Sequence, residues 1–211
     1  MGNVAKYINF LWNSTNRHGV HSPFVFGFVD KCIYAKGPNL PFREGYKFNE
    51  GISFRKAALL HRTISYFNAQ KLLALGDDTS AMTEILRYAG EKQNKKIWFF
   101  SPIAPIPGTI DLLYFSYNDR ETLLNVFNER LADANPNTIC IIDGIYNSTE
   151  TKQAWSDIKD HHAVTVTVDT YDLGVAFLRK GQAKQHFMIR LSQSPLLNAA
   201  LGIKKLYGLL D

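Results

Sequence analysis

Apolar residues recur at every third or fourth position up to about residue 70, which is the period of amphipathic helices. Ser22 followed by Pro23 has the composition of a helix start, with a hydroxyl at the N-cap and proline in the first turn. Glycine and prolines between residues 37 and 50 predict a loop. We therefore expect N-terminal helices over about residues 4–12, 23–34 and 57–67.

From residue 71 onward, short apolar runs alternate with amphipathic stretches, a pattern that predicts parallel strands joined by helices. Asn135–Asn137 predicts a turn, and Tyr171–Gly174 predicts the turn of an antiparallel hairpin. Ser194-Pro195 would open a final amphipathic helix. The predicted strands cover residues 71–75, 96–100, 110–115, 138–142, 164–168, 175–179 and 185–191, and the predicted helices between them cover 79–91, 119–131 and 149–159.

This order of elements predicts an α/β protein. We expect a three-layer α/β/α sandwich with a mainly parallel sheet, an antiparallel C-terminal hairpin at one edge of it and extra N-terminal helices. At 211 residues the chain is expected to form a single domain. Its predicted regions are an N-terminal helical region over 1–68, an α/β core over 69–191 and a C-terminal helix over 192–211.

Composition and charge exclude several classes of protein. Apolar residues make up 45% and charged residues 20%, no apolar run approaches the ~20 residues of a membrane span, and the start lacks a secretory pattern. Cys32 and Cys140 lie far apart, which suits a reducing cytoplasm and predicts no metal cluster. The net charge of +5 does not indicate nucleic-acid binding. Lys204 and Lys205 on the final helix favour a solvated face or a homodimer contact over a membrane contact.

The junction after the first predicted strand is the most informative part of the chain. In parallel sheets, the turn from the first strand to the first helix commonly binds a nucleotide-like cofactor. Here the turn carries one glycine, Gly76, followed by Asp77 and Asp78. Either aspartate would cap the helix that follows, and their charges would repel an anionic group of a ligand.

Three further parts of the chain carry a family resemblance: His18–Phe26, Ala154–Lys159 with Val164–Asp169, and Gly174–Arg179. With the order of elements, they resemble a bacterial O-methyltransferase-like family of the class I S-adenosylmethionine-dependent methyltransferases. The resemblance implies a Rossmann-like fold, S-adenosylmethionine as cofactor and a small-molecule methyl acceptor. It also implies which residues line the cofactor cleft, namely Gly76, Asp77, Ser101 and Ser116.

The chain departs from this family where the family carries acids or glycines. At three positions where the family has acids, this chain has the neutral residues Ala74, Ser101 and Ser116. At two positions where the family has glycines, it has Ser80 and Tyr117. The cofactor-binding motif is therefore degenerate. In metal-dependent relatives, acids at the strand ends hold a divalent cation, but here the pair has become Asp143-Gly144. One carboxylate is a poor site for such an ion, so we expect no metal.

Asp143 and His21 are the candidates for chemistry near the acceptor. Asp143 ends a predicted strand, where open parallel sheets bind ligands, although it can equally serve the turn. His18 and His21 can act as a lid or a base, or simply fix the loop before the second helix. Trp155 is predicted as a core residue. Two functions remain open: a methyltransferase, and a non-catalytic descendant that binds another ligand or a protein partner.

Overall fold

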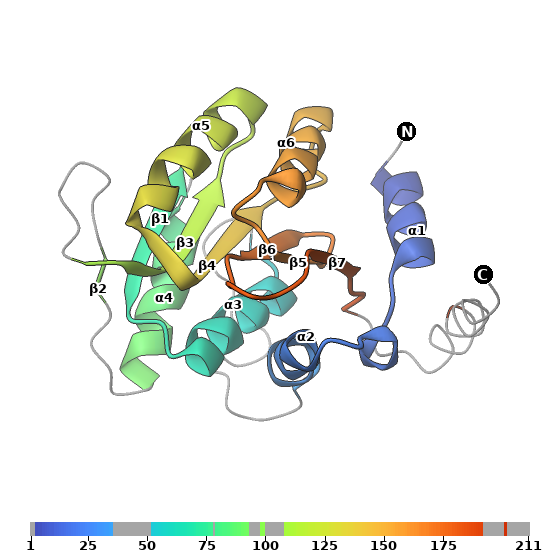
Figure 1. Ribbon diagram of the computed structural model, residues 1–211, viewed down its shortest axis with the longest axis horizontal. Helices are drawn as coiled ribbons and strands as arrows, with labels where there is room; N and C mark the ends of the chain where they lie inside the picture. Colours follow the sequence, from blue (N-terminus) through green and yellow to red (C-terminus); the bar gives the residue numbers. More distant parts are fainter. Residues whose placement is uncertain are drawn as a thin grey trace.

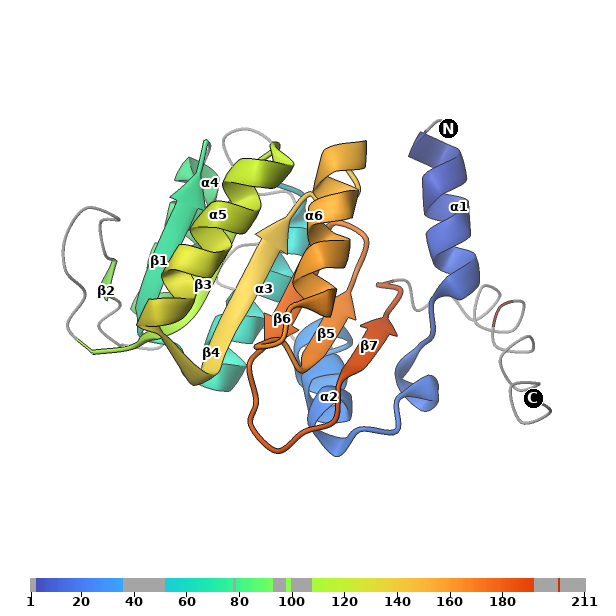
Figure 2. The ribbon, with the colours of Figure 1, turned by 45° about the horizontal axis from the view of Figure 1, so that its top comes forward.

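The computed structural model describes residues 3–35, 52–77, 79–92, 98–99, 108–191 and 201. Within these ranges a seven-stranded sheet lies between two layers of helices (Figures 1 and 2). The strands are β1 Lys71–Gly76, β2 Trp98–Phe99, β3 Ile110–Ser116, β4 Ala134–Asp143, β5 Val166–Asp169, β6 Leu173–Phe177 and β7 Gln185–Met188. The helices are α1 Asn3–Asn13, α2 Pro23–Phe28, α3 Phe54–Phe67, α4 Ser80–Lys92, α5 Arg120–Arg130 and α6 Thr149–Asp160, with shorter turns at Arg17–Gly19, Val29–Ile33 and Leu131–Asp133.

The architecture confirms the predicted three-layer α/β/α sandwich with a mainly parallel sheet. Buried residues of α2, α3 and α4 pack on one face of the sheet, and those of α5 and α6 pack on the other. The strand order is β2-β1-β3-β4-β6-β5-β7, in which β6 runs antiparallel to both of its neighbours. The predicted hairpin is therefore present as β5 and β6. It does not form the edge of the sheet, because β6 inserts between β4 and β5 and β7 adds a further strand parallel to β5.

The N-terminal helices form where the sequence places them. Ser22 caps α2 by accepting the amide of Val25, and the helical path continues through a π-helical turn to Ile33. α3 begins earlier than predicted, because the Ser53 hydroxyl accepts the Lys56 amide N–H at 3.3 Å and caps the helix there. α1 stands beside the layers, on the side of β7 (Figure 2). In the part of the chain that the structure describes, no helix combines the length and apolar character needed to cross a bilayer.

Two predicted turns differ from the structure. Asn135–Asn137 lies inside β4, where pairing shifts between Ile110 opposite Ala134 and Leu112 opposite Ile139. The extra residues form a bulge, in which the Asn135 side chain accepts the Asn137 amide at 2.7 Å, so turn chemistry operates within a strand.

The sequence predicts Gly174 in the hairpin turn, but Gly174 lies within β6. A Cβ atom there would approach the buried Trp155 ring to 2.8 Å, so glycine is required by packing at this position and not by a turn. Tyr171 occupies the turn instead, with a positive φ of 75°. The predicted loop over residues 37–50, Ser101 and, apart from Leu201, the final helix lie outside the described residues.

Candidate functional site

The carboxyl ends of β1, β3 and β4 lie at one edge of the sheet, which we call the carboxyl edge (Figure 2). Side chains alternate between the two faces along a strand. Tyr114 of β3 and Ile141 of β4 belong to the core under α3 and α4, so Ser116 and Asp143, two residues further on, face the same side. The structure therefore brings the strand-end candidates Gly76, Ser116 and Asp143 to one edge.

Gly76 packs directly against the end of β3. The two strands pair Gly76 with Ser116, and Gly76 has a φ of +139°. A Cβ atom at this position would lie 2.1 Å from the Ser116 carbonyl oxygen, so only glycine fits. The ladder continues one residue further, since the Asp77 amide N–H donates to the Ser116 carbonyl at 3.1 Å. Because this N–H bonds to the protein itself, it is not available to a ligand.

The Asp77 side chain is exposed next to this edge. The backbone of Asp77 still belongs to the strand ladder and Thr79 directly precedes α4, so the capping of this helix by Asp77 or Asp78 stays a prediction. Asp78 lies outside the described residues. The pKa of the Tyr117 phenol is raised, first by burial and then by the negative charge of Asp77.

Lys56, Asp143 and Tyr114 form a polar group, of which the sequence singled out only Asp143. The Lys56 ammonium pairs with Oδ1 of Asp143, and the Tyr114 hydroxyl donates to Oδ2. The Lys56 and Asp143 side chains are 14% and 15% exposed, so this ion pair is only partly screened by water. Lys56 lies in the first turn of α3, 87 residues before Asp143, and no local pattern could have connected them.

Asp172 extends this group from the turn between β5 and β6. Its pKa is raised by desolvation, lowered by the Lys56 ammonium and raised by the charge of Asp143. The Asp172 carbonyl also accepts the Gly144 amide N–H at 2.9 Å, which ties the turn to the residue after β4. The charge of Lys56 therefore acts on a second carboxylate besides that of Asp143. Among the described residues, no three His, Cys, Asp or Glu side chains are grouped to hold a metal ion.

His21 is not brought to the carboxyl edge. Its neighbour Ser22 accepts a hydrogen bond at 3.2 Å from Gln182, which follows β6. Because β6 runs antiparallel to the other strands, its end lies at the opposite edge of the sheet. His18 and His21 are both exposed, and the His18 amide donates to Asn16 at 3.0 Å. The geometry therefore favours their role in fixing the loop before α2.

A second polar cluster surrounds the buried Asp169. Its Oδ2 accepts hydrogen bonds from the Tyr146 hydroxyl at 2.7 Å and from the Trp155 indole N–H at 3.3 Å. Its Oδ1 accepts the Tyr171 amide at 2.9 Å, which supports the positive φ of that residue. Burial raises the pKa of Asp169, while these donors lower it. The predicted core position of Trp155 is confirmed, at 1% exposure.

No protein-family model matches the sequence, and no curated protein matches it. Similar solved structures include an O-methyltransferase from Bacillus cereus in complex with SAH, 10% identical over 60% of this chain and 82% of that one, with a TM-score of 0.39. The O-methyltransferase TomG from Streptomyces achromogenes, in complex with SAM, is 11% identical over 61% of this chain and 82% of that one, with a TM-score of 0.41. The SAH-bound methyltransferase PaMTH1 from Podospora anserina is 9% identical over 85% of this chain and 98% of that one, with a TM-score of 0.39. These are distant likenesses, and the fold assignment rests on the strand order and layers described above.

Proposed function

We propose that the protein is an S-adenosylmethionine-dependent O-methyltransferase that acts on a small molecule at the carboxyl edge without a metal ion. The observation that carries this proposal is the position of the Lys56–Asp143–Tyr114 group. It lies at the same edge of the sheet, and on the same face, as Gly76 and Ser116. In open α/β sheets, this is the edge at which ligands bind.

The residues around Gly76 fit a cofactor that carries positive charge. Gly76 presents no side chain at the strand end, and Asp77 offers an exposed carboxylate next to it. Such a carboxylate would attract the ammonium and sulfonium groups of S-adenosylmethionine. Ser116 adds a hydroxyl on the same face. We assign Gly76, Asp77, Ser116 and, from the sequence, Ser101 to cofactor binding.

The chain's own contribution to the chemistry lies on the acceptor side. S-adenosylmethionine, when bound, supplies a methyl group that is already activated on the sulfonium, so alignment contributes most of the rate. A cation near the acceptor hydroxyl favours its ionised form. Lys56 would supply that charge, and Asp143 and Tyr114 would act as positioning residues that hold the ammonium. Lys56 thus replaces the divalent cation that an acid at this strand end holds in metal-dependent relatives.

A second candidate function is a non-catalytic protein that keeps the fold to bind another ligand or a protein partner. The observation favouring it is the hydrogen bond from the Asp77 amide to Ser116, which removes one loop N–H from ligand binding. The neutral Ala74, which packs against the core, stands where the family carries an acid. This candidate predicts a folded protein that does not bind S-adenosylmethionine.

Calorimetric titration with S-adenosylmethionine, followed by transfer of labelled methyl groups to a panel of phenols and alcohols, tests the proposal. Asp77→Lys is expected to weaken cofactor binding by about 100-fold, because a repulsive charge replaces an attractive one. The matched control is Asp160→Lys at the exposed end of α6, which should bind as the wild type does. Absence of binding to the folded wild type would favour the second candidate.

A further inference from the structure

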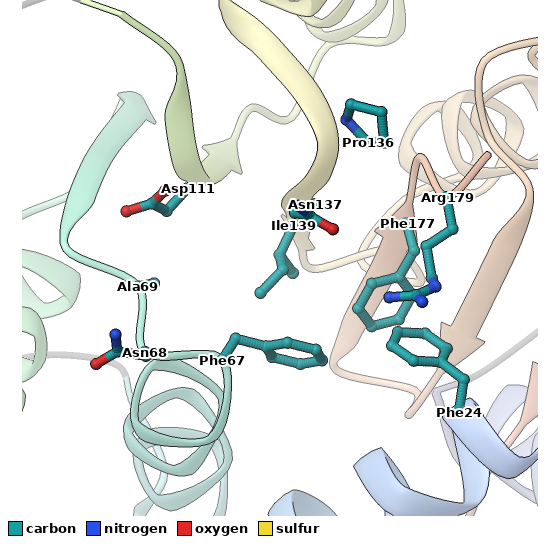
Figure 3. A pocket seen from close by; sticks show the side chains of 10 residues that line it. All are labelled: Phe24, Phe67, Asn68, Ala69, Asp111, Pro136, Asn137, Ile139, Phe177 and Arg179. Carbon is teal, nitrogen blue, oxygen red and sulfur yellow. The ribbon is translucent and has the colours of Figure 1, made fainter.

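We propose that a cavity at the edge opposite to the carboxyl edge is a second binding site, for a small aromatic carboxylate. The cavity has a volume of about 280 Å³, close to the lower size of known small-molecule sites. Figure 3 shows the side chains around it, with three aromatic rings on one side and charged groups at two ends. We call it the amino-edge pocket; the residues used in the argument are Phe24, Phe67, Asp111, Asn137, Phe177 and Arg179.

The amino-edge pocket lies where the parallel strands begin. Asp111 and Asn137 belong to the first halves of β3 and β4, and Phe177 ends the antiparallel β6. The pocket is therefore at the other end of the sheet from Gly76 and Asp143, so a ligand here would not compete with a cofactor. Two segments that stand out in the sequence, His18–Phe26 and Gly174–Arg179, meet at this pocket. Neither has a part in the proposed methyl transfer.

Three phenylalanines build an apolar wall. The Phe24 ring meets the Phe177 ring edge-on, with centroids 4.9 Å apart at 88°, and Phe67 lies 6.1 Å from Phe24 and 5.7 Å from Phe177. Phe24 and Phe67 are only partly buried, so both keep surface for a ligand. Aromatic rings gain most from another flat ring in an edge-to-face or offset arrangement. The wall therefore favours an aromatic ligand.

Arg179 supplies a positive charge at one end of the pocket. Its guanidinium carbon lies 4.1 Å from the Phe24 ring centroid, and Figure 3 shows the group reaching toward the Phe24 and Phe177 rings. Within the described ranges, no carboxylate forms an ion pair with Arg179. A guanidinium stacked on a ring keeps its in-plane N–H groups, which match the two oxygens of a carboxylate.

The other charged group of the pocket, the Asp111 carboxylate, accepts hydrogen bonds from the backbone. Oδ2 of Asp111 accepts the amides of Gln70 and Lys71, both at 2.9 Å, and thereby fixes the start of β1. Figure 3 places Asp111 across the pocket from Arg179. A ligand anion would therefore lie at the Arg179 end, away from Asp111, with its ring along the phenylalanine wall. Arg179 is the group that defines the ligand's charge.

Binding of phenylacetate tests this inference. It is measured by calorimetry and by the NMR shifts of the Arg179 side chain and the Asn137 amide. The neutral 2-phenylethanol is expected to bind at least about tenfold more weakly, because it cannot form the paired hydrogen bonds to the guanidinium. Arg179→Gln should lose binding by a similar factor, while Arg179→Lys, which keeps the charge but not the planar fork, should lose less.

A variant that fills the pocket separates loss of binding from loss of the fold. Asn137 is exposed in the β4 bulge, so Asn137→Trp should block the pocket while the thermal unfolding midpoint remains near the wild-type value. Loss of phenylacetate binding in this folded variant supports the site. Equal binding by wild type and Arg179→Gln, shifts outside the pocket, or tighter binding of phenyl phosphate than of phenylacetate would overturn the proposal. S-adenosylhomocysteine binding is measured in parallel and should not change, which separates this site from the carboxyl edge.

Discussion

The ammonium of Lys56 pairs with the carboxylate of Asp143 at the carboxyl end of β4. The Tyr114 hydroxyl donates to the other carboxylate oxygen, so both oxygens of Asp143 are engaged. Because Lys56 belongs to α3 and Tyr114 to β3, the group joins a covering helix to two neighbouring strands. It fixes an ammonium group at the edge where the proposed acceptor would bind.

Replacing Lys56 by methionine tests the role of that charge. We expect Lys56→Met to lower kcat for methyl transfer by about 100-fold, the usual effect of losing one group that stabilises a developing oxyanion. Cofactor affinity should be retained. The free energy of unfolding should fall by about 1–3 kcal/mol, because a poorly solvated Asp143 loses its charged partner. Chemical denaturation and steady-state kinetics measure the two effects.

Lys56→Arg is the matched control for this prediction. It keeps a positive charge beside Asp143 and should retain more activity and more stability than Lys56→Met. If Lys56→Met turned over as fast as the wild type, the ammonium would have no part in the reaction, and its pairing with Asp143 would be purely structural.

Gly174 and Gly27 provide a paired test of packing. In both cases an added Cβ would lie 2.8 Å from an aromatic side chain, Trp155 for Gly174 and Tyr66 for Gly27. Trp155 is buried, whereas Tyr66 is 44% exposed and meets the new atom with its flexible hydroxyl end. We expect Gly174→Ala to lower the free energy of unfolding by about 1–3 kcal/mol. Gly27→Ala should change it by less than about 1 kcal/mol in the same denaturant titration, and equal effects would contradict this account.

His61 should make the stability depend on pH. Burial, aided by the charge of Arg62, lowers the pKa of His61 from 6.5 to about 4. Between these values the unfolded chain binds a proton that the folded chain does not, so the stabilisation present above pH 6.5 is lost as the pH falls toward 4. The slope from this residue is at most about 1.4 kcal/mol per pH unit.

Denaturant titrations at pH 7, 6, 5 and 4 compare the wild type with His61→Gln. The wild type should lose more stability than the variant across this range, by up to about 3 kcal/mol. The exposed His21→Gln is the control and should follow the wild type, since its side chain is solvated in both states. Parallel curves for wild type and His61→Gln would show that protonation of His61 does not drive the acid destabilisation.

Local chemistry explains which parts of the fold could be predicted. The Ser22-Pro23 helix start and the first strand, predicted over residues 71–75, depend on residues adjacent in sequence, and both are confirmed. The sequence predicts Gly174 at the end of the hairpin turn, but its place depends on Trp155, which reaches it only through packing. The bulge at Asn135–Asn137 likewise depends on pairing with β3.

In the candidate site, too, some residues could be placed from the sequence and others could not. Strand ends follow from the strand pattern, so Gly76, Ser116 and Asp143 could be placed at one edge from the sequence. Lys56 could not, because its contact with Asp143 is set by how α3 lies across the sheet. The sequence predicts His21 near the acceptor on chemical grounds alone, but the course of β6 places its neighbour Ser22 at the other edge.

Thermal unfolding with and without S-adenosylmethionine tests the central claim, binding of this cofactor at the carboxyl edge, most directly. A ligand at about 100 times its dissociation constant adds about 2.7 kcal/mol to the free energy of unfolding. For a chain of 211 residues, this corresponds to a rise in Tm of roughly 5–11 °C. We predict such a rise in the wild type and its loss in Asp77→Lys. An unchanged Tm of the wild type at millimolar S-adenosylmethionine would contradict the proposed methyltransferase.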